Sequence, residues 1–234
     1  MAPAPTPDQG PAVAATVFGA ALPRVQMYAD ALASTAIERG ILGPAEAARV
    51  WDRHLLNCAP VAKLIAPDSS VVDIGSGAGL PGLVIALLRP DVDVTVLDAQ
   101  ARRCTFLTEM VEILDLGNRV MVVQGRAEDG LGGRRSDYVT VRAVAPVERL
   151  LPLCAGLLRS NGEILAIKGA GAAGEVTRAA DALKRYDARA QICELALPEG
   201  AGTTTVVRVV VGRTNVGPKR HGQGRRSAGE RKPG

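Results

Sequence analysis

The residues best suited to chemistry lie in residues 71–82, which read VVDIGSGAGLPG. Asp73 stands inside a short β-branched run that predicts a strand. Gly75, Gly77 and Gly79 then follow at alternate positions. Because glycine lacks a Cβ and reaches positive φ, such a loop turns sharply and lets a bound molecule approach the backbone closely. The stretch therefore predicts a binding loop for a small molecule.

The glycines fit two different spacings. Gly75, Gly77 and Gly79 form GxGxG, whereas Gly77, Gly79 and Gly82 form GxGxxG, the fingerprint of dinucleotide-binding loops. The glycine pattern alone leaves open whether the ligand is a dinucleotide or S-adenosylmethionine.

Acidic residues near successive strand ends favour S-adenosylmethionine. Asp73 is placed to accept hydrogen bonds, directly or through water, near a cationic amino group, whereas it would repel a pyrophosphate. Asp98 ends the next strand-like run, where a carboxylate accepts ribose hydroxyls, although NAD enzymes also place an acid there. GRAED, residues 125–129, brings Glu128 and backbone groups that suit an adenine edge. The alternative is structural, with Asp73 capping the turn and Asp98 capping the next helix.

Strand-like and helix-like segments alternate from residue 71 onward. This alternation predicts an α/β fold with a mostly parallel sheet covered by helices on both faces. The short loop PEGAG predicts a closing antiparallel hairpin, which makes the sheet seven-stranded. The predicted strands are 71–74, 92–99, 119–125, 136–144, 162–169, 188–197 and 203–213, and the predicted helices are 81–90, 101–116, one opening at Pro146, and 172–186.

The regions outside the alternating part differ in character. Residues 1–11 are rich in Pro and polar residues and are predicted to be disordered. Residues 12–69 predict an N-terminal helical cap with two helices, over roughly 12–40 and 44–65, and Pro23 interrupts the first of them. Residues 70–212 form the predicted ligand-binding domain, and residues 213–234 form a predicted flexible basic tail.

The charge is distributed unevenly. The net charge is +4, and the segment after Gly212 holds seven of the 28 Lys and Arg residues but only one acid. Lys and Arg neutralise phosphates, so the tail favours a nucleic acid partner, with a merely solubilising tail as the alternative.

The four cysteines lie far apart without a CxxC pair, which predicts no metal site and a reduced, cytoplasmic compartment. No apolar run reaches the length of a membrane span, so we expect no membrane association. We also expect a monomer.

Several motifs together resemble the RsmG (GidB) family of 16S ribosomal RNA guanine-N7 methyltransferases. GSGAGLPG, a strand ending in Asp98, and RRCTFL carry the resemblance, which continues through QGRAED, VRAVAP and AIKG. WDRHLLNC, residues 51–58, is similar to the family's N-terminal His-(Ile/Leu)-x-Asp-Ser motif, with Asn57 and Cys58 in place of the Asp and Ser. His54 in this motif has the helical spacing from Trp51 and Cys58 that is typical of a packed residue.

This resemblance implies a Rossmann-like class I methyltransferase that uses S-adenosyl-L-methionine. The implied substrate is N7 of a guanosine in the decoding-region (530) loop of 16S rRNA, guanine 527 in rRNA numbering, within the small ribosomal subunit or its assembly intermediate. Carried over by position, the implied cofactor contacts are Gly75, Leu80, Ala127, Glu128 and Arg142.

Three basic residues at predicted strand ends, Arg126, Arg142 and Lys168, are candidates to position the RNA through phosphate or the guanine O6 edge. The alternative is ordinary strand-end charge in solvent. Guanine N7 has a free lone pair at neutral pH, so we expect no general base. Two rival functions remain at this point, an NAD(P)-dependent oxidoreductase and a non-catalytic RNA-binding module.

Overall fold

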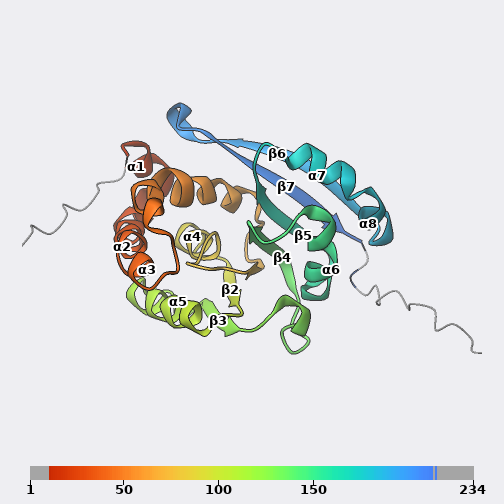
Figure 1. Cartoon of the computed structure of the whole chain (residues 1–234), viewed down its shortest axis with the longest axis horizontal. Coiled ribbons are helices and arrows are strands. Elements are labelled where there is room, and N and C mark those ends of the chain that lie inside the picture. The colour runs from red at the N-terminus through yellow and green to blue at the C-terminus, as the bar shows by residue number, and fades with distance from the viewer. Residues whose placement is uncertain (1–10, 213, 215–234) are drawn as a thin grey trace, which may run out of the picture.

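One seven-stranded sheet forms the centre of the molecule (Figure 1). The computed structural model describes residues 11–212 and 214. The strands are β1 (Ser70–Ile74), β2 (Asp93–Asp98), β3 (Val120–Gln124), β4 (Ser136–Arg142), β5 (Leu158–Lys168), β6 (Ala188–Ala196) and β7 (Thr203–Val211). They lie in the order β3-β2-β1-β4-β5-β7-β6, and only β7 runs antiparallel to its neighbours, β5 and β6. The predicted fold class is confirmed.

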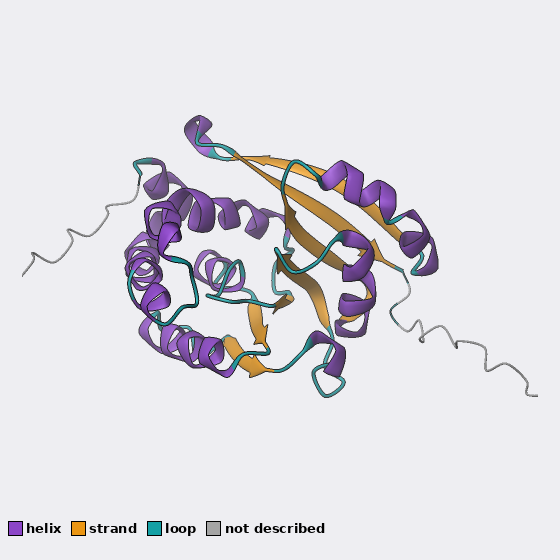
Figure 2. Cartoon of the chain, viewed as in Figure 1, coloured by secondary structure: helices purple, strands orange, loops and turns teal. Residues whose placement is uncertain are grey.

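Alternation along the strands divides the core into two layers. Val71 and Val96 belong to one buried cluster, whereas Val72 and Leu97, one residue along their strands, belong to the other. The first layer is covered by α4 (Gly82–Leu88) and α5 (Ala101–Ile113), and the second by α6 (Val147–Cys154), α7 (Ala172–Arg178) and α8 (Ala180–Arg185) (Figure 2). The order of strands reverses between β1 and β4, which is where doubly wound sheets bind ligands.

The N-terminal cap is built from short segments rather than from two long helices. They are α1 (Val13–Phe18), η1 (Gly19–Ala21), α2 (Leu22–Ala33), α3 (Thr35–Glu38), the 3-10 helix η2 (Pro44–Arg49), the π-helix η3 (Val50–Leu56) and the 3-10 helix η4 (Ala59–Leu64). Pro23, Pro44 and Pro60 each lie in the first turn of such a segment, where the missing N–H of proline is tolerated. Pro23 and Pro60 therefore lie where new segments begin inside the two predicted helices, whereas Pro44 lies at the predicted start of the second.

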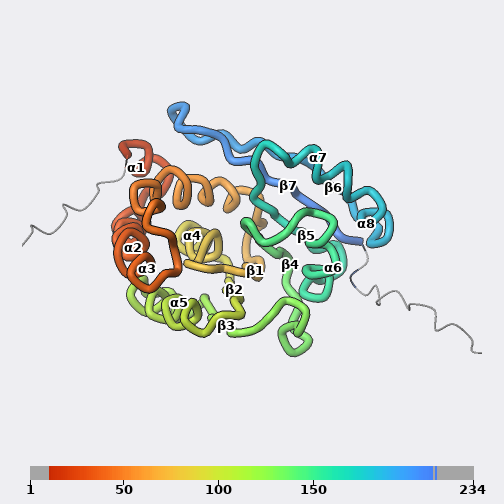
Figure 3. Tube along the Cα trace, in the orientation of Figure 1, coloured from red at the N-terminus to blue at the C-terminus, as the bar shows by residue number. Residues whose placement is uncertain are grey.

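The cap and the sheet share one core. Tyr28 and Leu55 are fully buried in the cluster that also holds Val96 and Leu83. In Figure 3 the first helix lies beside the tip of the β6–β7 hairpin, and Thr16 Oγ1 donates to Glu199 Oε1 at 3.1 Å.

Two connections differ from the pattern expected of this sheet. The predicted helix 172–186 is divided at Ala179, whose side chain is fully buried between α7 and α8. Between β3 and β4 stands only one 3-10 turn, η5 (Ala127–Asp129), followed by a glycine-rich loop at 130–135. Part of the sheet near β3 therefore lacks a covering helix.

In the described part of the chain, none of the helices is both long and apolar enough to cross a membrane. The same residues include no cluster of His, Cys, Asp or Glu placed to hold a metal ion. The four cysteines are free thiols. Most of the predicted basic tail and of the predicted disordered N-terminus lies outside the described residues.

Candidate functional site

The glycine loop after β1 has the backbone conformation that the sequence predicts. Gly75, Gly77 and Gly79 have φ of +63°, +60° and +98°. The backbone N–H of Gly75 donates to Leu97 O on β2 at 2.8 Å, which joins the loop to the neighbouring strand. A Cβ added at Gly77 would meet only Gly75 O, 3.8 Å away, so its direction is open. The loop leaves room for a ligand against bare backbone at this point.

Asp73 organises this loop from beneath. Its carboxylate is fully buried and accepts hydrogen bonds from Ser76 Oγ (2.6 Å), the Gly82 backbone N–H (3.0 Å) and Thr140 Oγ1 (2.9 Å). Burial raises the pKa of Asp73 to about 6, although these hydrogen bonds oppose the shift. The structural alternative is therefore realised, because Asp73 fastens the loop to the start of α4. Its contact with the donor's amino group stays a prediction.

Two of the glycines are required by packing. A Cβ at Gly79 would lie 2.6 Å from Leu83 Cδ1 and 2.7 Å from Tyr28 Oη. A Cβ at Gly82 would lie 2.8 Å from Val96 Cγ1 and 2.9 Å from Asp73. Close packing of the loop against α4, β2 and the cap thus accounts for Gly79 and Gly82, the last two glycines of the GxGxxG spacing. The role of Gly79 in cofactor binding stays a prediction.

Asp98 lies beside the loop at the end of β2. Its side chain is 3% exposed, and Oδ2 accepts from the Gly77 backbone N–H at 3.0 Å and lies 3.3 Å from Arg103 Nη1. Oδ1 accepts from the Gln100 backbone N–H at 2.9 Å, just before α5 begins. Asp98 therefore stabilises the turn into α5 and also holds the glycine loop. Its predicted contact with the ribose hydroxyls is compatible with this position but untested.

The segment after β3 reaches the same edge of the sheet. The Gly125 backbone N–H donates to Asp98 O at 3.0 Å, which places η5 next to the end of β2. Ala127 is buried, and Glu128 and Arg126 are exposed. Leu80, the remaining residue that the resemblance implies, is buried at the end of the glycine loop. The structure thus gathers the predicted cofactor residues of three successive strand ends along one edge.

Arg142, at the end of β4, points to the cap. Its Nη2 lies 2.5 Å from His54 Nδ1, and its Nη1 donates to Cys58 Sγ at 3.5 Å. Burial, and then the positive charge of Arg142, lower the pKa of His54 to about 4, with Glu46 opposing the shift. His54 is therefore neutral at pH 7. Since arginine only donates, His54 Nδ1 accepts and the proton is on Nε2, which lies 2.7 Å from Glu46 Oε2.

This contact between cap and strand end was missed by the sequence analysis. His54 is buried, as predicted for a packed residue, but it also orients Arg142 across 88 positions of sequence. Asn57, at the motif's Asp position, accepts from Thr204 Oγ1 on β7 through its O (2.9 Å) and Oδ1 (3.1 Å). The WDRHLLNC motif was the one sequence feature that pointed to this region. It does not indicate which residues of the sheet its side chains contact.

Lys168 holds the loop that follows β4. Its Nζ donates to Ala145 O at 2.6 Å and lies 2.8 Å from Glu175 Oε2, with only 9% of the side chain exposed. Val144, in the same loop, lies over Gly75, because a Cβ added at Gly75 would be 3.0 Å from Val144 Cγ2. Lys168 therefore fixes a loop that borders the cofactor edge. Its predicted RNA contact, and that of Arg126, remain untested.

Comparison with known proteins gives the family. The model of the GidB family, rRNA small subunit methyltransferase G, matches residues 21–196. The chain is 44% identical to the ribosomal RNA small subunit methyltransferase G of Renibacterium salmoninarum over 84% of this chain and 92% of the relative. It is 47% identical to the protein of that name from Thermobifida fusca, over 83% and 82% of the two chains.

Solved structures give the fold. TYW2 of P. horikoshii in complex with MeSAdo superposes with a TM-score of 0.55 at 16% identity, covering 68% of this chain and 63% of that one. A SAM-dependent O-methyltransferase from Thermotoga maritima superposes at 0.51 with 13% identity, covering 66% and 64%. The chain therefore shares the fold of these two proteins.

The residues present fit the cofactor S-adenosylmethionine. Gly77, Asp98 and Ala127 lie along one edge of the sheet, at or after the ends of β1, β2 and β3, and the order of strands reverses next to β1. The family match sets aside the dinucleotide-dependent oxidoreductase and the non-catalytic module. The chain belongs to the rRNA small subunit methyltransferase G (GidB) family and is an rRNA methyltransferase.

Proposed function

We propose that the protein methylates N7 of a guanosine in the decoding-region loop of 16S rRNA, guanine 527 in rRNA numbering, with S-adenosylmethionine as methyl donor. The family match supports an rRNA substrate, and the resemblance of residues 71–107 and of the later motifs supports this particular atom. The observation that carries the proposal is the junction of the glycine loop, Asp98 and Arg142 at one edge of the sheet.

S-adenosylmethionine supplies the methyl group when bound. The chain's task is to hold the acceptor in line, because N7 already has a free lone pair and no proton has to leave first. Positioning of this kind lowers a barrier by up to roughly 7–11 kcal/mol in favourable cases. Gly77 provides the open backbone, Asp98 the ribose acceptor, and Ala127 and Glu128 the adenine side, while Leu80 packs behind the loop.

Arg142 borders both the cofactor edge and the cap. Its guanidinium is half-buried and held by His54 and Cys58, so it presents a fixed cation at the end of β4. We assign it to the boundary between donor and target base, with Arg126 at the exposed rim contacting phosphate. Lys168 acts through the loop 143–146 that it fixes.

The decisive test uses small ribosomal subunits that lack the modification. Protein, methyl donor and these 30S particles are mixed, and any new 7-methylguanosine is mapped by nuclease digestion and mass spectrometry. Methylation at N7 of the named guanosine is expected. Methylation at another atom or another nucleotide would contradict the proposal while leaving the family assignment intact.

A binding measurement tests the cofactor residues. Asp98→Ala is expected to weaken S-adenosylhomocysteine binding at least tenfold, because the ribose acceptor and the anchor of Gly77 are both lost. The control is Asp181→Ala on α8, an exposed acid on an element that packs against the far end of the sheet. We further propose that the protein works as a monomer in the cytoplasm, which size-exclusion chromatography and cell fractionation test directly.

A further inference from the structure

A pocket of about 560 Å³ lies at the edge of the sheet opposite to the glycine loop. Its lining includes Ser70, Asp93, Val120 and Ser136, the first residues of β1, β2, β3 and β4. Because these strands are parallel, their first residues lie at the other edge from the cofactor residues at their ends. The pocket is therefore separate from the site described above.

The pocket exists because one crossover lacks a helix. The β1–β2 and β2–β3 connections contain α4 and α5, but β3 returns to β4 through η5 and the loop 130–135 alone. The sheet surface beside that loop stays open, since Met121 is 38% exposed and Thr95 is half-buried although both lie within strands. This bare surface forms the floor of the pocket.

The rim of the pocket is strongly basic. It carries four arginines, Arg119, Arg134, Arg135 and Arg159, against a single acidic lining residue, Asp93. Two of these arginines serve the fold, because Arg119 Nη2 donates to Ala86 O (2.7 Å) and Arg135 Nη1 donates to Leu158 O (3.0 Å). The other two, Arg134 and Arg159, lie at the exposed rim.

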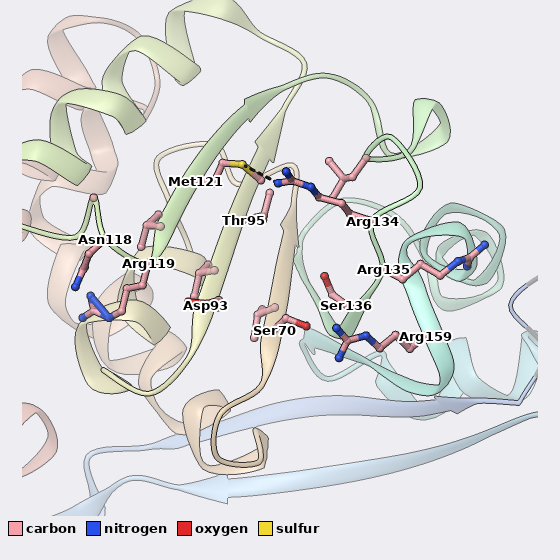
Figure 4. A pocket seen from close by; sticks show the side chains of 15 residues that line it. Ser70, Asp93, Thr95, Asn118, Arg119, Met121, Arg134, Arg135, Ser136 and Arg159 are labelled. Carbon is pink, nitrogen blue, oxygen red and sulfur yellow. Dashed lines mark hydrogen bonds between the residues drawn. The ribbon is translucent and has the colours of Figure 1, made fainter.

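Arg134 and Arg159 differ from this pair in exposure. Arg134 is exposed, and its guanidinium contacts the Met121 Sδ at 3.6 Å, a weak acceptor. Arg159 pairs with Asp137 at 2.6 Å, yet 58% of its side chain remains exposed. Figure 4 shows Arg134 beside Thr95 and Met121, and Arg159 at the other end of the floor near Ser70 and Ser136. The two cations therefore flank an open floor of mixed polar and apolar side chains.

We propose that this arginine pocket holds a stretch of rRNA backbone during methylation, with Arg134 and Arg159 as phosphate contacts. The inference rests on the proposed function, since it adds a second contact for the same substrate. Guanidinium groups suit phosphate oxygens, and phosphate contacts fix the register of a nucleic acid. None of the described lining residues is aromatic, so the pocket suits backbone rather than a stacked base.

The route from the active edge to the pocket is short. Strand β3 has five residues, which span about 17 Å at the rise of an extended chain. At about 3.4 Å per stacked nucleotide, roughly five nucleotides cover this distance. Arg126, exposed at the cofactor edge after β3, marks the near end of the route, and Arg134 marks the far end. A strand leaving the target nucleotide can follow the uncovered sheet surface between them.

The test removes one phosphate contact without touching the cofactor edge. For Arg134→Ala, the affinity for 30S particles and the KM for their methylation are measured over a range of salt concentrations. We expect a several-fold weaker affinity and a slope of log affinity against log salt that is smaller by about 1. The value of kcat and S-adenosylhomocysteine binding should be unchanged. Arg134→Lys keeps the charge and should restore the slope.

The matched control is Arg178→Ala on α7, another exposed arginine, located away from the pocket. If Arg134→Ala and Arg159→Ala both keep the wild-type salt slope, the inference is overturned while methylation by the wild type still supports the proposed function. If the wild type binds 30S particles but methylates nothing, the proposed function fails. The salt slopes of 30S affinity for the wild type and the variants still test this inference in that case. Loss of pyrophosphate binding in Arg134→Ala with an unchanged rRNA slope would assign the pocket to a small anion instead.

Discussion

At the scale of single residues, the buried carboxylates of the candidate site hold the backbone of the loop on which the cofactor is proposed to lie. Asp73 and Asp98 stand near the ends of neighbouring strands, and both accept backbone N–H groups of the glycine loop or of the segment that follows it. Each carboxylate therefore sets the conformation of the surface on which the cofactor is proposed to lie. A substitution at either position changes the shape of the loop in addition to removing one acceptor.

The pair of His54 and Arg142 gives a prediction at this scale. His54→Ala removes the acceptor that orients Arg142, so S-adenosylhomocysteine affinity and kcat/KM should each fall several-fold. His54→Asn places an oxygen near the position of Nδ1 and should recover most of the loss. Isothermal titration and single-turnover methylation measure both. Equal defects in the two variants would contradict an orienting role and leave only a packing role.

The same histidine predicts a dependence of stability on pH. The pKa of His54 is about 4 in the folded protein, where Arg142, Arg53 and Glu46 face it, against 6.5 for an ordinary histidine. Between these values the unfolded chain binds more protons, so the folding free energy that the neutral ring contributes is lost as pH falls. From pH 7 to pH 5, urea unfolding should show that the wild type loses up to about 2 kcal/mol more than His54→Asn. Parallel curves for the two proteins would contradict the assigned neutral state.

At the scale of elements, the glycine loop separates binding from packing. Gly77 and Gly79 both have positive φ, but an added Cβ at Gly77 points into open space and one at Gly79 collides with Tyr28 and Leu83. Two glycines that look equivalent in the sequence therefore have different consequences when replaced.

Alanine substitutions measure this difference. Gly77→Ala should cost about 1–2 kcal/mol of stability from backbone strain and should weaken S-adenosylhomocysteine binding at least tenfold, because the methyl group enters the ligand's space. Gly79→Ala should cost an additional 1–3 kcal/mol from overpacking. Urea denaturation and calorimetry give both quantities. Wild-type binding by Gly77→Ala would show that the ligand lies elsewhere.

The elements of the sheet were predictable from the sequence, and those of the cap were not. β1 and β2 start within a residue of their predicted positions, because β-branched runs closed by glycine or acid depend on local pattern. β5 begins at Leu158, four residues before its predicted start, through pairing of Leu158 with Ser136 on β4. The cap's 3-10 and π segments depend on packing against the sheet, so helical periodicity alone predicted longer helices.

Prediction of the candidate site from the sequence has the same limit, because only its local parts follow from the sequence pattern. The glycine loop and Asp98 were found because neighbouring residues in sequence form them, and parallel strands bring their ends to one edge. The contact of Arg142 with His54 joins two regions 88 residues apart, and no local pattern predicts it. The arginine pocket was also missed, because it arises where a helix is lacking and not where a motif is present.

At the scale of the whole molecule, rRNA binding is expected to be shared between the described body and the tail. Residues after Gly212 hold seven Lys and Arg residues and one acid, and all of these charged residues lie outside the described residues. On the body, Arg134 and Arg159 offer a second, fixed group of cations. If both bind phosphate, each contributes its own share of the released counterions.

Deleting the residues after Gly212 tests whether the contributions of the tail and of the arginine pocket to rRNA binding are additive. The deletion should weaken 30S affinity and lower the salt slope by about 0.7–0.9 for every tail cation that contacts phosphate, while S-adenosylhomocysteine affinity stays unchanged. Because the tail and the arginine pocket are separate groups of charges, the deletion and Arg134→Ala should lower the slope additively in one chain. An unaltered slope after deletion would count against any phosphate contact by the tail. A combined effect smaller than the sum would mean instead that tail and pocket compete for the same stretch of rRNA.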